Sequence, residues 1–490
     1  MSTSGRYAEE LVEAGFAVEV ADAPLLHDGL NTADLAHVLL LHERRVVPDP
    51  AARRLLSVVL DAVRTPAERF DYDPAHGEVY NCRERCFAAR IGRDAGWLHA
   101  GRTRREAVRI ALRLRARRDT ADLIEAAARF CLAAARGADT HAETLMVEQT
   151  YLQHAQPSTF GHYLLAAAYP VLREVERLAA ELDGIDRSPA GAGGVNGSPL
   201  TGDRERMAAL LGFDDVIEHT RDAMWQVDAF TAVVQGAARL ATALDRLAED
   251  LEIYCSEEFG WLRLAERHTR TSVLMPQKRN PYALTMVRGE AGILIGRATG
   301  LLALAKSPSA RSDNLIFSYG EVPRSLDLAT RAARLMAGVV DGLEVDAGAM
   351  RAALDAGFSQ AADLAELLMV HAGLDYRCAY DVVGACVRRA AAEGRRGVDL
   401  TVDRLDAAAA ELGVAGLNAP AAAELAAALD PESIVRSRRT RGGAAPEVVR
   451  GMAKDCESAA HTALGMVRAR RAVWDAAEAD VVRRATELVG

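Results

Sequence analysis

One loop near the middle of the chain combines a hydroxyl, an ammonium and a carboxamide: residues 271–281 contain Ser272, Lys278 and Asn280. This set of groups suits the removal of a C–H proton next to a carboxylate. A base takes the proton, the ammonium stabilises the doubly negative aci-carboxylate that forms, and the amide fixes that carboxylate in place. Any one of these residues alone would be an ordinary polar surface residue, so the prediction depends on all three standing together.

The composition favours a large helical protein. The chain has 490 residues, of which 50% are hydrophobic and only 5% aromatic, while alanine, leucine, arginine and glutamate are abundant. This length can bury a large core in two or three subdomains, and these residue types favour long helices. The expected fold class is therefore mostly α. The formal charge of −10 gives little support to nucleic-acid binding.

Apolar residues follow a helical period through several stretches. The clearest helix is predicted over 222–255, where apolar side chains recur three and four residues apart from Phe230 to Tyr254. At 1.5 Å per residue this helix would be about 50 Å long, and such a seam usually packs against other long helices. Further helices are predicted over 104–136, 159–183, 282–305, 322–342, 359–371 and 447–487. The arginine-rich stretch 102–118 is predicted to form a solvated or intersubunit face.

The sequence gives no sign of a metal, a cofactor or a membrane. The seven cysteines are scattered without paired spacing or neighbouring histidines, so they are predicted to be reduced packing residues. The glycines between 191 and 197 lack the lysine of a P-loop and are expected to form a turn. The first residues lack the apolar core of a signal peptide, and no stretch is apolar enough to span a bilayer. We expect a cytoplasmic protein with no metal, no cofactor and no membrane contact.

Five separate blocks of sequence resemble the argininosuccinate lyase branch of the aspartase/fumarase superfamily, and they occur in the family's order. The loop 271–281 is similar to the signature G-S-S-x-M-P-x-K-x-N-P. The other blocks are 98–106, similar to L-H-T-G-R-S-R-N-D; 150–162, similar to T-H-L-Q-x-A-Q-P-x-T-F-G-H; 203–213, similar to D-R-x-x-x-A-x-x-L-G-F; and 442–446, similar to G-G-T-A-P. A single match would be weak, but five in order indicate a common fold over most of the chain.

The resemblance implies a three-domain subunit of the aspartase/fumarase type with a long central helix bundle. The expected boundaries are an N-terminal helical domain at 1–103, the bundle at 104–357 and a C-terminal helical domain at 358–490. The resemblance also implies a homotetramer that acts on a small dicarboxylate, with active sites formed where three subunits meet. Blocks that lie far apart in one chain would then meet in one site.

Carried over by position, the resemblance assigns roles to the matching residues. Ser272 becomes the base, and Lys278 and Asn280 hold the carboxylate beside the acidic carbon. A free serine is far too weak a base, so the loop is expected to stabilise its alkoxide through backbone N–H groups and nearby cations. Substrate contacts are expected from Thr103, Arg104, Thr150 and Gln156.

Several positions depart from the family pattern. Tyr151 and Thr285 occupy the places of the histidine and glutamate that form the relay associated with the general acid, so both halves of the relay are missing. Arg105 replaces an asparagine, and Arg311 lies in the segment 310–319 that normally helps to receive the guanidino part of the substrate. Tyr151, Arg105 and Arg311 are therefore predicted to contact a different substrate. The two arginines would suit a third anionic or electron-rich group.

These losses lead to a hypothesis about the leaving group. Departure of an amine or a guanidine needs a proton, and deletion of the general acid should cost roughly 10²–10⁴ in rate, whereas a stable anion needs no proton. Elimination of nitrite from nitrosuccinate, with fumarate as the other product, is the preferred hypothesis. One alternative is cleavage of argininosuccinate or another N-substituted aspartate, with Tyr151 or a water as the acid. Another is a catalytically silent, crystallin-like structural relative, although such a protein has no reason to keep Ser272, Lys278 and Asn280.

Overall fold

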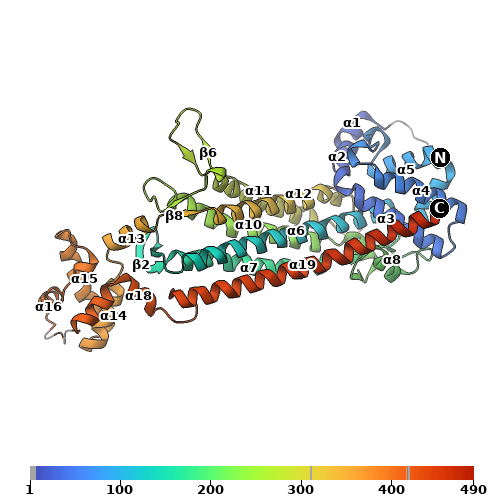
Figure 1. Ribbon diagram of the computed structural model, residues 1–490. Helices are drawn as coiled ribbons and strands as arrows, with labels where there is room; N and C mark the ends of the chain where they lie inside the picture. The colour runs from blue at the N-terminus through green and yellow to red at the C-terminus, as the bar shows by residue number, and fades with distance from the viewer. Residues whose placement is uncertain (1–6, 309–311, 415–416, 418–419) are drawn as a thin grey trace.

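A computed structural model describes residues 7–308, 312–414, 417 and 420–490. Helices make up most of this part of the chain, which confirms the predicted mostly α class. Within it, six long helices run side by side through the middle of the molecule, and smaller helical groups lie at the two ends (Figure 1). The six are α6 (Arg104–Thr140), α7 (Phe160–Ile185), α10 (Asp228–Tyr254), α11 (Tyr282–Ala305), α12 (Ser318–Asp341) and α19 (Pro446–Val489).

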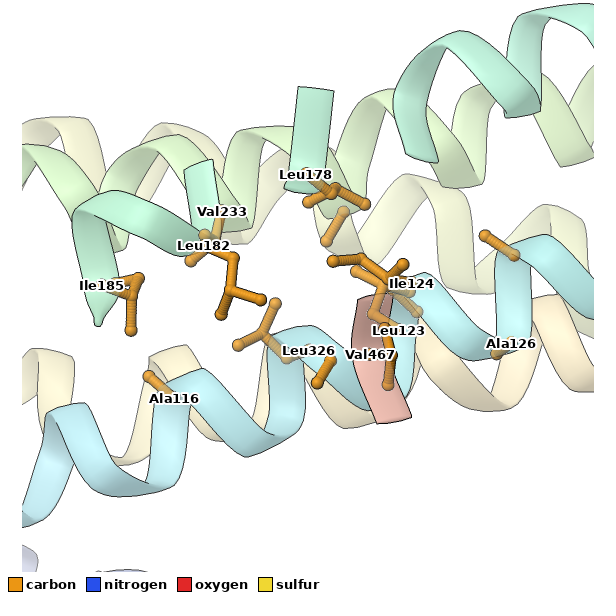
Figure 2. Packing of buried hydrophobic residues seen from close by; sticks show 14 of the residues in the cluster. Ala116, Leu123, Ile124, Ala126, Leu178, Leu182, Ile185, Val233, Leu326 and Val467 are labelled. Carbon is orange, nitrogen blue, oxygen red and sulfur yellow. The ribbon is translucent and has the colours of Figure 1, made fainter. Parts of the chain in front are cut away.

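The long helices share one continuous apolar core. Leu123 and Ile124 of α6 lie beside Leu178 and Leu182 of α7, with Val467 of α19 close to them (Figure 2). Helix α6 is buried along most of its length, because it contacts α3, α7, α12 and α19. At 1.5 Å per residue α6 is about 55 Å long, so residues at its two ends lie far apart.

The predicted helices overlap helices of the structure, with one difference at the start of α10. The stretch 222–255 is not a single helix: α9 (Thr220–Trp225) ends before Gln226, and α10 begins at Asp228. No proline or glycine marks this break in the sequence. Instead, Gln226 has an extended backbone, and its side-chain oxygen accepts a hydrogen bond from buried Arg113 of α6. A tertiary contact thus interrupts a helical pattern that continues in the sequence.

The arginine-rich stretch 102–118 forms only in part the solvated or intersubunit face that its sequence predicts: Arg104, Arg115 and Arg118 are at least partly exposed, but other arginines are not. Arg113 and Arg117 are buried between helices. Arg113 donates hydrogen bonds of 2.9 and 3.0 Å to the last carbonyls of α7, and Arg117 forms a 2.9 Å ion pair with buried Asp186. The last carbonyls of a helix have no partners within it, so they are good acceptors for a guanidinium. These arginines therefore connect α6 to α7 inside the subunit.

The N-terminal end of the molecule contains α3 (Ala23–Glu43), α4 (Asp49–Arg64) and α5 (Val79–Ile91). Buried Asp34 of α3 forms ion pairs with Arg83 (2.8 Å) and Arg102 (2.5 Å), and it accepts a 3.0 Å hydrogen bond from the Tyr80 hydroxyl. Burial alone would raise the pKa of Asp34, but the two guanidinium groups lower it below its ordinary value. This network fixes Arg102, the residue just before the predicted substrate contacts at the start of α6.

The C-terminal third of the chain has two parts. Helices α14 (Ala361–Ala372), α15 (Tyr376–Ala392), α16 (Val402–Glu411), α17 (Ala422–Leu429) and α18 (Pro431–Ser437) lie at the other end of the molecule, and most of them share a separate small core. Helix α19 then returns along the bundle and contacts α3, α4, α6 and α7. We keep the division at 1–103, 104–357 and 358–490 as a proposal, although α19, which lies in its third part, packs against the bundle.

Strands are few and short in the described chain. The antiparallel pairs are β1 (Leu145–Thr150) with β2 (Gln153–Thr159), β5 (Leu262–Arg263) with β8 (Glu344–Val345), and β6 (Arg270–Thr271) with β7 (Arg279–Asn280); β3 (Arg187–Ser188) and β4 (Asp215–Val216) are parallel. The other short helices include α1 (Glu9–Leu11), α2 (Ala17–Ala21), α8 (Arg204–Leu211) and α13 (Ala347–Ala356). In the part of the chain that the structure describes, no helix is both long and apolar enough to cross a membrane.

Candidate active site

The loop 271–281 forms a hairpin that projects from the side of the bundle (Figure 1). Strands β6 and β7 pair Arg270 with Asn280, and the backbone N–H of Ser272 donates to the carbonyl of Lys278 at 3.3 Å. Helix α11 begins two residues after β7, so the end of the loop is anchored on a long helix. The hairpin therefore presents Ser272 and Lys278 from a rigid base.

The side chain of Ser272 accepts two backbone hydrogen bonds within the loop. The N–H of Met275 lies 3.0 Å from Ser272 Oγ, and the N–H of Leu274 lies 3.3 Å from it. Donors aimed at an oxygen stabilise negative charge on that oxygen. This is the environment that a serine needs if its alkoxide is to act as a base.

Lys278 and Asn280 differ in what they contact. The amide nitrogen of Asn280 donates to the carbonyl of Arg270 at 3.1 Å, which fixes the amide and leaves its oxygen able to accept. The ammonium of Lys278 is exposed, and the described residues offer it neither a hydrogen bond nor an ion pair. Val273 and Leu274 at the tip are also exposed. The loop thus carries an ammonium that no described carboxylate neutralises, on the residue whose carbonyl accepts from the N–H of Ser272.

A second hairpin, formed by β1 and β2, carries Thr150 and Tyr151. Tyr151 and Leu152 form its two-residue turn with φ values of 54° and 56°. These values lie in the left-handed region of the backbone, which residues other than glycine rarely adopt. Two such residues in sequence match a type I′ turn, and each costs on the order of 1 kcal/mol or more. Tyr151 is 99% exposed, and Thr150 and Gln156 are exposed on the strands. Tyr151 therefore stands at the tip of the hairpin, where its side chain faces solvent.

His162 connects this hairpin to the last sequence block, a role that the sequence pattern alone did not assign. Its Nδ1 lies 3.3 Å from Ser158 Oγ and 3.6 Å from the Glu148 carboxylate, and its Nε2 lies 3.0 Å from the carbonyl of Gly442. The nearby carboxylate of Glu148 is the main reason that the pKa of His162 is raised above its ordinary value. The block 442–446 is thereby fixed to the base of the hairpin.

We expect His162→Gln to lower the melting temperature most at acidic pH. A group whose pKa is raised by folding stabilises the folded protein below its unfolded pKa, and this contribution is lost as the pH rises through the folded pKa. The difference from wild type should therefore be largest below pH 6.5 and shrink above it. His461→Gln, on the exposed surface of α19, is the control. A pH-independent difference would contradict the proposed charge on His162.

Thr103, Arg104 and Arg105 lie at the start of α6 and line a cavity of about 490 Å³. Thr103 Oγ1 accepts from the N–H of Glu106 at 3.3 Å, which caps the helix, and donates to the carbonyl of Gly193 at 3.2 Å. The glycine-containing loop after β3 therefore lies over this helix start. Its position beside Thr103 agrees with the turn that the sequence predicts.

The two arginines of this cavity already face carboxylates. Arg104 lies 3.3 Å from the carboxylate of Glu78, and Arg105 lies 3.0 Å from that of Glu19. The sequence suggested that Arg105 would suit a third anionic group of the substrate; in the structure a carboxylate of the chain itself occupies that place. The remaining predicted contact, Arg311, falls outside the described residues.

The predicted site residues form three separate groups in one subunit. The cavity with Thr103 lies at the N-terminal end of α6, whereas Thr150 follows its C-terminal end, about 55 Å along the helix (Figure 1). Ser272 lies on the hairpin that projects from the bundle near the second end. No rearrangement of side chains can bring these groups together within one chain. A complete site from all three would need more than one subunit.

The chain is similar to known proteins in sequence and in overall fold. The chain matches the family described as "Lyase" over residues 82–296 and that described as "Argininosuccinate lyase C-terminal" over residues 358–436. It is 31% identical over 434 residues to argininosuccinate lyase of Methanothermobacter thermautotrophicus, which covers 87% of this chain and 91% of the relative. Argininosuccinate lyase of Corynebacterium glutamicum is 33% identical over 450 residues, covering 90% and 91%. The solved structure of an EDDS lyase variant with bound fumarate superposes with a TM-score of 0.87 at 25% identity, covering 99% of this chain and 97% of that one.

Proposed function

The chain belongs to the argininosuccinate lyase family of the aspartase/fumarase superfamily, a fumarate-forming C–N lyase, and we propose that Ser272 is its catalytic base. The Ser272 alkoxide takes a proton from the methylene carbon of a 2-substituted succinate. Lys278 and Asn280 stabilise the aci-carboxylate, and the bond to the substituent then breaks to give fumarate. The observation that carries this proposal is the pair of backbone N–H groups directed at Ser272 Oγ, in a hairpin that also carries the unneutralised ammonium of Lys278.

One face of α11 supports the homotetramer that we propose. This face is exposed over most of the helix and carries no charged residue; it consists of Tyr282, Thr285, Met286, Gly289, Gly292, Ile293, Gly296, Thr299, Gly300 and Ala303. The four glycines have open space where a Cβ would stand, so another helix could approach closely. An uncharged exposed face of this length is typical of an interface. Symmetric packing of α11 against other copies would bring separate site residues together.

We expect Ile293→Glu to dissociate the assembly and to abolish activity. Ile293 is 51% exposed in the single subunit, so the substitution should be tolerated by the subunit itself. In the proposed interface the buried carboxylate would cost several kcal/mol. Light scattering after size exclusion measures the mass, and a fumarate assay measures the activity. Val473→Glu, which places the same charge on exposed α19, is the control, and an unchanged mass for Ile293→Glu would refute this interface.

Nitrosuccinate is the substrate that we propose first. Tyr151, at an exposed hairpin tip, and Thr285, exposed on α11, stand where the family has the histidine and the glutamate of its relay. Neither half of that relay is therefore present at these positions. Nitrite departs as a stable anion and needs no proton from such a relay. Elimination would give fumarate and nitrite.

A second candidate is an N-substituted aspartate with an amine leaving group. The carboxylates of Glu19 and Glu78 line the cavity beside Arg104 and Arg105, and carboxylates favour a cationic or hydrogen-bond-donating substituent. The relatives named argininosuccinate lyase support the same direction. A screen for fumarate release from nitro-, amino- and guanidino-substituted succinates separates the two candidates. Nitrosuccinate is the wrong substrate if no nitrite is released while an amine adduct is cleaved well.

We expect Tyr151→His to affect the two leaving groups differently. Histidine tolerates the left-handed backbone of this position and would restore one half of the missing relay. Release of an amine should rise about tenfold or more, whereas nitrite release should change by less than about twofold. Fumarate absorbance and a nitrite assay give the two rates. A large gain with nitrosuccinate would mean that its leaving group does need a proton.

A further inference from the structure

The segment 7–22 covers the cavity at the start of α6 and contributes a carboxylate to it. The segment consists of α1, a π-helical turn (Val12–Phe16) and α2. Glu19 of α2 points at Arg105, with 3.0 Å between Oε2 and Nη1, and only 10% of the Glu19 side chain is exposed. The rings of Tyr7 and Phe16, whose centroids are 4.7 Å apart, also line the cavity.

A second ion pair holds this segment in place. Asp22, the residue between α2 and α3, lies 2.7 Å from Arg324 of α12. A Cβ on Gly320 would collide with the Asp22 carboxylate, so the glycine leaves room for this contact. The segment is therefore attached both to α6 and to α12. Glu19 is directed at Arg105 by this attachment as well as by its own charge.

The charges of the cavity are balanced by these contacts. Arg104 faces Glu78 and Arg105 faces Glu19, so two guanidinium groups meet two carboxylates. A ligand with a third carboxylate would have to displace Glu19 before it could use Arg105. A neutral or cationic substituent can enter without breaking the pair.

We propose that Glu19 is a specificity-determining residue that excludes a formally anionic substituent at C2 of the succinate. This inference rests on the proposed function, because it takes the cavity as the part of the site that receives the substituent. Both candidate substrates meet the requirement, since a nitro group carries no net charge and an amine is neutral or cationic. A substituent whose only charge is a carboxylate does not meet it. Glu19 acts through Arg105 and takes no part in proton removal.

The test measures binding of two stable compounds by calorimetry with the intact protein. Succinate has no substituent at C2, whereas propane-1,2,3-tricarboxylate carries a carboxymethyl group there and so has a third carboxylate. We expect Glu19→Gln to lower Kd for the tricarboxylate about fivefold, the effect of freeing a partly exposed ion pair, and to leave Kd for succinate unchanged. Adding Arg105→Gln to this variant should remove the gain. Glu13→Gln, an exposed residue of the same segment, removes the same charge and should change neither Kd.

The outcomes separate this inference from the proposed function. An unchanged ratio of the two Kd values in Glu19→Gln would overturn it, and so would an equal shift in Glu13→Gln. Binding of neither compound to any variant would also overturn it, because the cavity would then not be a succinate site. If the wild-type protein binds succinate but releases no fumarate from any substrate, the proposed function fails while the titration still decides the role of Glu19. Melting curves check that each variant is folded.

Discussion

Ser272→Ala reduces kcat for fumarate release by about 10²- to 10⁴-fold, the range expected when a positioned base is removed. The hydroxyl accepts hydrogen bonds from two backbone N–H groups of its own loop. No other described residue forms a hydrogen bond with it. Without this oxygen, the loop has no group at position 272 that can accept the proton from the substrate methylene. The hairpin itself should persist, since β6 and β7 pair through the backbone. A continuous absorbance assay for fumarate measures the loss.

The control for this substitution lies next to it. Val273 is fully exposed and makes no polar contact through its side chain, so Val273→Ala should keep kcat within about twofold of wild type. Both variants should have the wild-type melting temperature and the wild-type mass. If Ser272→Ala kept half of the wild-type kcat with the assembly intact, another group would have to remove the proton.

The long helices were predictable because their apolar periodicity continues for many turns. The predicted 282–305 coincides with α11, and the predicted 447–487 lies within α19. The break before α10 was not predictable, because it depends on a contact between Gln226 and Arg113, which are far apart in sequence. Burial of Arg117 was missed for the same reason: its partner Asp186 follows a different helix. From sequence alone, a charged residue is predicted to be exposed when the buried acid that pairs with it lies far away along the chain.

The candidate site also has parts that the sequence could predict and parts that it could not. Ser272, Lys278 and Asn280 stand close in sequence, so their arrangement on one loop could be expected from the motif. Glu19 belongs to no motif, and only the folded chain brings it to Arg105. The assembly of the three groups of site residues is a property of several chains. No pattern within one sequence specifies how those chains are oriented.

After the base, Lys278 is the residue most important to the proposed mechanism, because its positive charge stabilises the intermediate. The intermediate carries two negative charges on one carboxylate, and no carboxylate of the described subunit neutralises the ammonium of Lys278. The guanidinium of its neighbour Arg279 donates to the carbonyl of Pro276 at 2.8 Å, which holds that side chain against the loop. An unpaired ammonium can respond to charge that develops during the reaction, whereas a paired one is already compensated.

We therefore expect Lys278→Met to lower kcat by about 10²- to 10³-fold with a smaller change in KM, as for loss of a group that acts mainly in the transition state. Methionine keeps the length and the apolar stem of the side chain, so the loss reports the charge. Lys454→Met on the exposed surface of α19 is the matched control and should be silent. A rise in KM with unchanged kcat would show that Lys278 binds ground state and transition state equally. The second negative charge of the intermediate would then have to be stabilised by a cation from another subunit.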